Sequence, residues 1–98
     1  MKYFAWNAEK NEQLKAERGI SFEEVVFHIE NGDLLDEVDH PNLEKYPHQR
    51  MYIVRIGNYA FLVPFVQTGE EVFLKTIIPN RKATMMYLGD VDEEDKIG

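Results

Sequence analysis

Three histidines are the side chains best suited to acid–base chemistry in this chain, because an imidazole titrates near neutral pH. His48 and Arg50 flank the start of a β-rich segment, and His40 lies in the polar stretch before them. We take His48 and Arg50 as candidate site residues and favour His48 over His40. The alternative is that both of these histidines are exposed loop residues without a catalytic role. His28 falls within an amphipathic helix and is expected on its surface.

Arg55 and Lys75 are further candidates, and the alternation of side chains along a strand predicts where they point. Arg55 lies opposite the apolar face of its segment, which should meet the helices and consists of Tyr52, Val54 and Ile56. Lys75 lies opposite the apolar face of its own segment, on the side that carries Phe73 and Ile77. Both cations should therefore leave the helix-covered core, and they could converge on the open face. The alternative is that each solvates the sheet and pairs with carboxylates.

Arg81, Lys82 and Tyr87 belong to a predicted short helix over residues 81–88. Arg81 and Lys82 fall in its first turn, where free backbone N–H groups and the positive end of the helix dipole attract anions. Cations are unusual choices at that end, which is consistent with a phosphate site, although solvated side chains are the simpler explanation. Tyr87 could stack on a ring or donate a proton, but it could equally form the packing face of the helix with Ala83, Met85 and Leu88.

The sequence predicts neither a metal site nor a disulfide. Cysteine is absent, and the three histidines lack the spacing of paired zinc ligands. The N-terminal residues become polar too soon for a secretory signal, and the longest apolar run, 59–66, is less than half of the roughly 20 residues of a membrane helix. We therefore expect a cytoplasmic protein without a cofactor, and the lack of cysteine suits a reducing compartment.

Two helices are predicted in the first third of the chain. Asn7 can cap a run of strong helix formers, 8–18, which Gly19 ends. Ser21 and Glu24 have the spacing of a capping box, so a second helix should begin there and end at Asn31-Gly32. Its hydrophobic staple would pair Ile20 with Val25. Its buried stripe would consist of Phe22, Val25, Val26 and Ile29.

The remaining segments are predicted to form strands. A short aromatic strand over 2–6 precedes the helices, and an acidic edge-like segment, 34–38, leads into a polar loop over 39–49. Three β-rich runs then form a meander over 50–56, 59–66 and 72–78. The middle run is apolar on both faces. It should therefore be the central strand, with helices on one side and another cover on the other.

Length and charge limit the classes of protein that this chain can be. Ninety-eight residues, of which 30% are charged, suit a single globular domain, which we place at residues 1–89. Residues 90–98 hold five acidic residues and one lysine, so this expected mobile acidic tail carries −4 of the net charge of −7. The net charge of −7 argues against simple binding to a phosphate backbone, but the −3 that remains for residues 1–89 permits a local basic cleft.

Three short motifs give the chain a family resemblance: Phe4-Ala5-Trp6-Asn7, Gly19-Ile20-Ser21-Phe22-Glu23-Glu24 and Arg81-Lys82-Ala83-Thr84. With the predicted order of elements, they resemble the BrnT-like toxin family, a branch of the RelE-like ribonuclease toxins of type II toxin–antitoxin systems. The resemblance spans about residues 4–88. It implies an α+β, RelE-like fold, with helices packed on one face of a small antiparallel sheet, a short C-terminal helix and a site on the open face.

The resemblance also implies a metal-independent endoribonuclease that uses the 2′-hydroxyl of its RNA as the nucleophile and is neutralised by a small DNA-binding antitoxin. Such a reaction needs a base, an acid and cations for the charge that develops on the phosphate. The expected catalytic residues are Arg55, Lys75, His48 and Arg50, and the expected RNA-binding residues are Arg81, Lys82 and Tyr87. The alternative is a non-catalytic module of the same fold that binds a partner protein through exposed apolar residues such as Phe73 and Ile77, without converging cations.

Overall fold

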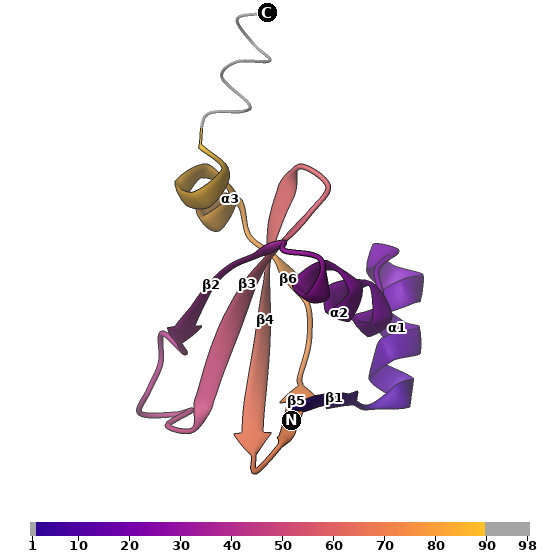
Figure 1. Cartoon of the computed structure of the whole chain (residues 1–98), viewed down its shortest axis with the longest axis vertical. Helices are drawn as coiled ribbons and strands as arrows, with labels where there is room; N and C mark the ends of the chain where they lie inside the picture. Colours follow the sequence, from indigo (N-terminus) through magenta and orange to yellow (C-terminus); the bar gives the residue numbers. More distant parts are fainter. Residues whose placement is uncertain (1, 90–98) are drawn as a thin grey trace, which may run out of the picture.

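Apart from one short extra strand, the elements follow the chain in the order predicted, and they form an α+β structure (Figure 1). The computed structural model describes residues 2–89, and the acidic tail predicted at 90–98 lies outside them. The helices within these residues are α1 (Ala8–Arg18), α2 (Phe22–Glu30) and α3 (Arg81–Leu88). The strands are β1 (Tyr3–Trp6), β2 (Leu34–Asp39), β3 (Gln49–Ile56), β4 (Tyr59–Thr68), β5 (Glu71–Leu74) and β6 (Ile78–Pro79).

The six-stranded sheet is mixed, which corrects the antiparallel sheet expected from the sequence. Its strands lie in the order β1-β5-β4-β3-β2, and β6 pairs with β4 beyond the end of β5. β1 runs parallel to β5, with Tyr3 opposite Glu71 and Trp6 opposite Leu74, whereas the other pairs within residues 2–89 are antiparallel. β2 to β5 follow one another through direct connections that reverse the chain. β1 reaches the sheet before the two helices, so no hairpin fixes its direction.

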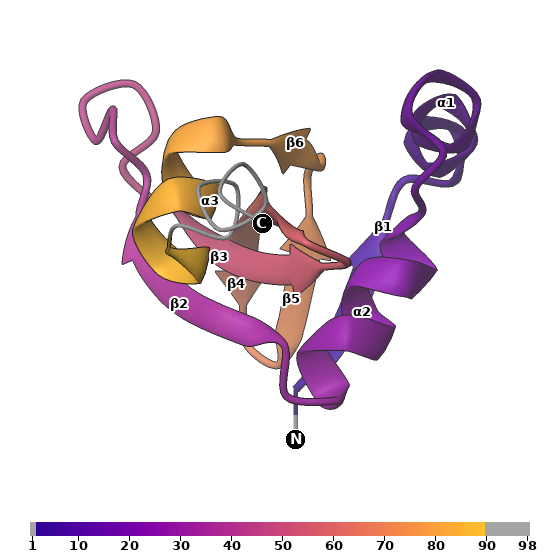
Figure 2. The same cartoon turned by 90° about the horizontal axis from the view of Figure 1, so that it is seen from above.

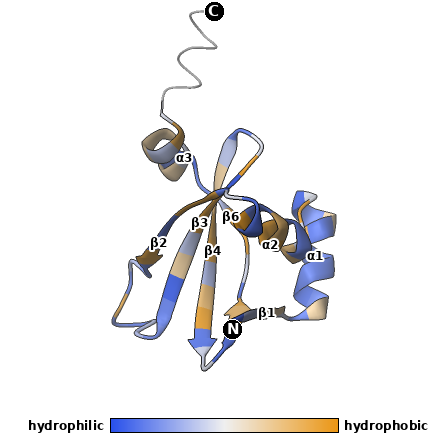
Figure 3. Cartoon of the chain, viewed as in Figure 1, coloured by the Kyte–Doolittle hydropathy of each residue, from blue (hydrophilic) through white to orange (hydrophobic). Residues whose placement is uncertain are grey.

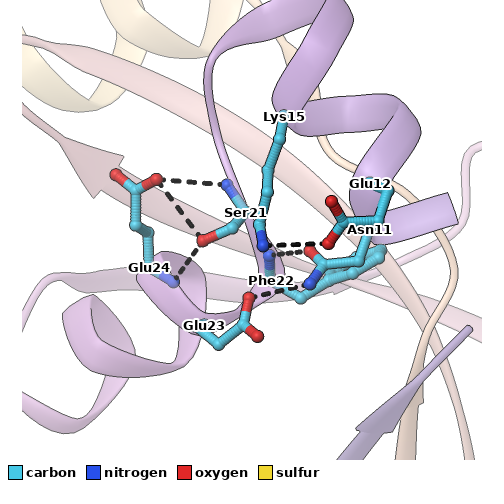
Figure 4. A network of polar contacts seen from close by, with 7 residues as sticks. All are labelled: Asn11, Glu12, Lys15, Ser21, Phe22, Glu23 and Glu24. Atoms are coloured by element: carbon cyan, nitrogen blue, oxygen red, sulfur yellow. Dashed lines mark hydrogen bonds and ion pairs between the residues drawn. The ribbon is translucent and has the colours of Figure 1, made fainter. Parts of the chain in front are cut away.

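Both N-terminal helices begin and end where the sequence predicts. The Asn7 side chain accepts a hydrogen bond from Lys10 N at 2.9 Å, and Gly19 ends α1 with a φ of 68°. At the start of α2, Ser21 Oγ accepts from Glu24 N at 3.1 Å and Ser21 N donates to Glu24 Oε1 at 3.2 Å (Figure 4). The predicted capping box is therefore confirmed, and local side-chain chemistry sets the ends of both helices.

A buried asparagine joins the two helices, a contact that the sequence did not predict. Asn11 in α1 is 4% exposed, and its Oδ1 accepts a hydrogen bond from Phe22 N at 2.8 Å. Its Nδ2 donates to Glu23 Oε1, also at 2.8 Å (Figure 4). Because Phe22 is fully buried, Asn11 supplies the acceptor that the first N–H of α2 lacks within its own helix. The same contact is the first cause of a lowered pKa for Glu23.

Apolar side chains are buried on both faces of the sheet. We call the face covered by α1 and α2 the α1/α2 face. The core between it and the helices contains Leu14, Phe22 and Val25 of the helices and Tyr52, Val54, Val63, Phe65, Val72 and Leu74 of the strands. On the opposite face, here the α3 face, Ile53 and Ala60 pack against Ala83 of α3. Figure 2 shows the sheet between α3 and the helix pair, and Figure 3 shows that α1 is mostly hydrophilic. The element that covers the second face of β4 is therefore α3. It partly covers the sheet face that the sequence predicts to be open.

The last predicted strand, 72–78, ends early, at Leu74. Pro64 in β4 explains this, because its backbone faces the departing chain and accepts a hydrogen bond from Lys75 N at 2.8 Å but has no N–H to donate. The chain then leaves the sheet before returning as β6. Ile77 is fully buried in the cluster of the α1/α2 face, where Arg18 donates to its carbonyl oxygen, and Ile78 is exposed. The predicted alternation beyond Lys75 is therefore wrong, and Ile77 is not on an open face.

Candidate functional site

The structure divides the predicted site residues among separate places on the molecule. His48 and Arg50 lie together where the 40–48 loop enters β3. Arg55 lies at the other end of β3, near the start of α3. Lys75 follows β5 on its own. Of the predicted catalytic residues, His48 and Arg50 therefore share one pocket, and Arg55 and Lys75 lie outside it.

His48 and Arg50 line an open pocket of about 320 Å³. Its other walls come from the end of β2, the preceding loop and the end of β4, and they consist of Asp39, Pro47, Gln49, Phe65 and Gln67. In the sheet register Asp39 lies directly opposite Arg50, and Arg50 lies directly opposite Phe65. Since Arg50 precedes Tyr52 by two residues, its side chain belongs to the α1/α2 face. In Figure 1 this end of β3 lies away from α1 and α2.

Two carboxylates hold the Arg50 guanidinium. Its Nε lies 3.3 Å from Glu37 Oε2, and its Nη2 donates to the Glu37 carbonyl oxygen at 3.5 Å. Its Nη1 lies 3.7 Å from Asp39 Oδ1, a longer and weaker contact. All three side chains are substantially exposed, so these ion pairs contribute at most about 1 kcal/mol each to stability. Their main effect is on the orientation of the guanidinium.

The loop that carries His48 is held by hydrogen bonds at both of its ends. His40 N donates to Gln49 O at 3.1 Å, and Gln49 N donates to Tyr46 O at 3.2 Å. Asn42 N donates to His40 Nδ1 at 3.0 Å, and the His40 ring lies 4.5 Å from the Tyr46 ring, centroid to centroid. His40 therefore has a structural role in the loop. His48 is left exposed at the pocket, where it can exchange protons with a ligand.

Phe65 is the apolar residue next to the pocket, and it is almost fully buried. Its side chain is 1% exposed and stacks on Tyr52, with ring centroids 4.0 Å apart and 13° between the planes. Burial raises the pKa of the Tyr52 hydroxyl, and the nearby Glu37 carboxylate raises it further, while Arg50 opposes them. Tyr52 is thus a neutral, buried packing partner over the whole physiological range. The polar groups that line the pocket include a carboxylate, an imidazole and a guanidinium, from Asp39, His48 and Arg50.

Asp39 is the functional candidate that the sequence did not predict. Its position beside His48 and Arg50 depends on the pairing of β2 with β3, in which Asp39 opposes Arg50. The sequence predicts an acidic edge strand that ends at residue 38, which places Asp39 in the following loop. The two-residue spacing of Glu37 and Asp39 is the feature of the sequence that indicates this position, because it places both carboxylates on one face of a strand. Gln67 falls outside the strand predicted over 59–66, whereas β4 extends to Thr68.

Arg55 and Lys75 point to the same face, as predicted, but the structure does not bring them together. Arg55 lies opposite Ala60 in β4, whereas the backbone N–H of Lys75 donates a hydrogen bond to Pro64 of the same strand. Ala60 and Pro64 are four residues, or roughly 13 Å, apart along β4. Arg55 Nε donates to Gly57 O at 3.2 Å, and the Lys75 ammonium lies over the Phe73 ring, 5.4 Å from its centroid. Two separate exposed cations thus replace the expected convergence.

Arg81 and Lys82 are exposed in the first turn of α3, close to Arg55. Ala60, the cross-strand partner of Arg55, donates its N–H to Thr84 Oγ1 at 2.9 Å and accepts from Asn80 N at 3.1 Å. The Asn80 side chain also caps α3 by accepting from Ala83 N at 2.7 Å, as predicted. This capping occupies one of the free donors that a phosphate at the helix start would use.

Tyr87 is a packing residue of α3, the simpler of its two predicted roles. Its ring packs against the cluster of Ile53, Ala60 and Ala83 on the α3 face. Its hydroxyl donates to Asp36 Oδ2 at 2.7 Å, and this hydrogen bond is the first cause of a raised Tyr87 pKa and of a lowered Asp36 pKa. A ring held in this way is poorly placed to stack on an RNA base, so its predicted RNA contact stays a prediction.

Comparison of the chain with protein-family models, with curated proteins and with solved structures finds no match. Within residues 2–89, no three His, Asp or Glu side chains gather in a way that could hold a metal ion. None of the helices in that part of the chain has the length and apolar character required to cross a membrane. The BrnT-like resemblance stays a prediction from the sequence.

Proposed function

We propose that this chain is a BrnT-like, metal-independent endoribonuclease toxin whose active site is the pocket at the start of β3. The observation that carries the proposal is that Asp39, His48 and Arg50 line one open pocket. These three side chains supply a carboxylate base, an imidazole acid and a cation, which is the set of groups that cleavage through the 2′-hydroxyl requires. The antitoxin expected from the resemblance, a small DNA-binding protein, is part of the same proposal.

The proposed reaction assigns one role to each side chain. Asp39 accepts the proton of the RNA 2′-hydroxyl as the 2′-oxygen attacks the adjacent phosphorus. The bond from phosphorus to the 5′-oxygen breaks, and His48, in its protonated form, gives a proton to that leaving oxygen. Arg50 stabilises the extra negative charge on the phosphate oxygens in between. The products are a 2′,3′-cyclic phosphate and a free 5′-hydroxyl, and no metal takes part.

The test compares the pocket with the sheet-face cations in one RNA cleavage assay. Asp39→Asn, His48→Gln and Arg50→Ala should each lower the rate by roughly 10²- to 10³-fold, equivalent to about 2.7 to 4 kcal/mol, while their melting curves stay close to that of the wild type. Arg55→Ala, Lys75→Ala and Arg81→Ala should change the rate by only a few-fold. Glu44→Gln, an exposed change in the loop that carries His48, is the matched control and should have no effect.

Two outcomes would contradict the proposal. If the Arg55 and Lys75 variants lose activity and the pocket variants do not, the active site lies on the α3 face, as the sequence alone predicts. If the wild type neither cleaves RNA nor slows growth when it is expressed alone, the chain is not a ribonuclease toxin.

The second candidate function is a non-catalytic module that binds a partner protein. The observation that favours it is the exposure of two methionines on α3, Met85 at 51% and Met86 at 68%, since flexible thioether side chains are common at protein-binding surfaces. The version that relied on exposed Ile77 is excluded, because Ile77 is fully buried. Capture of a partner that depends on both methionines, without any RNA cleavage, would favour this candidate.

A further inference from the structure

Glu37 lies outside the walls of the pocket, yet it makes two polar contacts with the Arg50 guanidinium, whereas the wall residue Asp39 makes one. In the register of β2 and β3, Glu37 is opposite Tyr52, so it is the diagonal neighbour of Arg50 on the α1/α2 face. Its carboxylate contacts Arg50 Nε at 3.3 Å, and its own carbonyl oxygen accepts from Nη2 at 3.5 Å. One residue thus contacts both nitrogens of one edge of the guanidinium.

The remaining edge of Arg50 is held loosely. Nη1 faces Asp39 Oδ1 across 3.7 Å, and the Asp39 side chain is 64% exposed. An incoming phosphate oxygen can therefore replace Asp39 at Nη1 without disturbing the contacts with Glu37. That exchange would leave Asp39 beside the phosphate and free to accept a proton.

The backbone of Glu37 is itself fixed from the other side of the sheet. Glu37 N donates to Asp36 Oδ1 at 2.8 Å, and the second oxygen of Asp36 accepts from the Tyr87 hydroxyl of α3 at 2.7 Å. The register of β2 also shifts between Leu34 and Asp36, next to this contact. Glu37 therefore contacts Arg50 from an anchored stretch of strand and not from a free loop.

We propose that Glu37 is the positioning residue of the pocket, which holds one edge of the Arg50 guanidinium so that the Nη1 edge receives a phosphate oxygen of RNA. The inference rests on the proposed function. Glu37 does not touch the substrate and acts through Arg50 alone. Its negative charge disfavours RNA binding, so a purely electrostatic role and a positioning role predict opposite effects of removing it.

The experiment separates RNA binding from RNA cleavage. Cleavage is measured on an ordinary RNA, and binding on a 2′-O-methyl oligonucleotide of the same sequence, which lacks the nucleophile. Glu37→Ala should lower kcat by roughly 10- to 100-fold because Arg50 loses its orientation, while the Kd for the 2′-O-methyl oligonucleotide stays equal or falls. Glu37→Gln keeps a side-chain oxygen of the same reach beside Nε, as well as the backbone carbonyl that accepts from Nη2, and should restore most of kcat. Glu44→Gln, which removes one charge nearby, should leave kcat unchanged.

A spectroscopic signal of Arg50 provides an independent readout. The Arg50 Nε–H should give a resolved NMR signal in the wild type and in Glu37→Gln, and the signal should be lost in Glu37→Ala. Wild-type kcat in Glu37→Ala, or a kcat in Glu37→Gln as low as in Glu37→Ala, would overturn the positioning role. Failure of the proposed function looks different, because in that case the wild type itself does not cleave RNA.

Discussion

Replacing Asn11 with alanine tests whether the contact between α1 and α2 stabilises the fold as the geometry indicates. The substitution removes the acceptor of Phe22 N and the donor to Glu23. Glu23 is exposed and regains water, but Phe22 is fully buried, so its N–H is left without a hydrogen bond. An unsatisfied buried donor costs about 1–3 kcal/mol, and we expect the free energy of unfolding to fall by that amount.

The assay is denaturant unfolding followed by circular dichroism, with Gln13→Ala as the matched control. Gln13 lies in the same helix, but its side-chain amide makes an exposed hydrogen bond to Glu17. Its removal should change stability by less than about 0.5 kcal/mol. For a domain of this size, each kcal/mol lost by the Asn11 variant should lower Tm by roughly 4–8 °C. Equal unfolding midpoints for the Asn11 variant and the wild type would refute the reasoning.

Asn11→Asp adds a pH dependence of known sign. The aspartate keeps an acceptor for Phe22 N, but it places a carboxylate against Glu23 in place of the amide donor. Repulsion between the two carboxylates raises their pKa values in the folded state, so the folded protein binds protons more readily than the unfolded chain. The variant should therefore be least stable near pH 7 and approach the wild type as the pH falls toward about 4.5. A deficit that does not shrink on acidification would show that the two carboxylates do not interact.

Three further predictions concern the first turn of α2, the contact between α3 and the sheet, and metal dependence. Ser21→Ala removes the acceptor for Glu24 N and should destabilise the fold by about 0.5–2 kcal/mol in denaturant melts without changing RNA cleavage. Tyr87→Phe removes the bond to Asp36, so it should lower stability between about pH 4 and pH 10. Its deficit should shrink as the pH falls through the lowered pKa of Asp36, and again as the pH rises through the raised pKa of Tyr87. A chelator should leave melting and RNA cleavage unchanged, and a chelator-sensitive rate would contradict the metal-independent reaction.

Local signals predicted most of the secondary structure, because they involve residues close together in the chain. The caps at Asn7, Ser21 and Asn80 are hydrogen bonds within one turn, and each is present. The alternation of Tyr52 and Val54 against Ile53 likewise predicts which face each occupies. The helix ends and the two faces of β3 could thus be predicted from the order of residues alone.

The mixed sheet and the pocket depend on contacts between distant segments, which no local pattern specifies. The parallel pairing of β1 with β5 joins residues nearly seventy positions apart, for example Tyr3 and Glu71. The early end of β5 follows from Pro64 in the neighbouring strand, and the burial of Ile77 follows from the path of the chain afterwards. Asp39 joins His48 and Arg50 only through the register of β2 with β3. The sequence therefore indicated His48 and Arg50 as candidates, but it did not indicate which other residues lie beside them in the folded protein.

The hydrogen bonds along β2 also bear on aggregation, because β2 is an edge strand of the sheet. An unprotected edge offers its backbone N–H and C=O groups as a template for a strand from another molecule. At Glu37, however, the side chain of Asp36 already accepts from the N–H and the side chain of Arg50 already donates to the C=O. A neighbouring chain would have to break both contacts in order to extend the sheet at that residue. Substitution of Asp36 should thus make fibril-like association through β2 easier, even under conditions in which the fold itself persists.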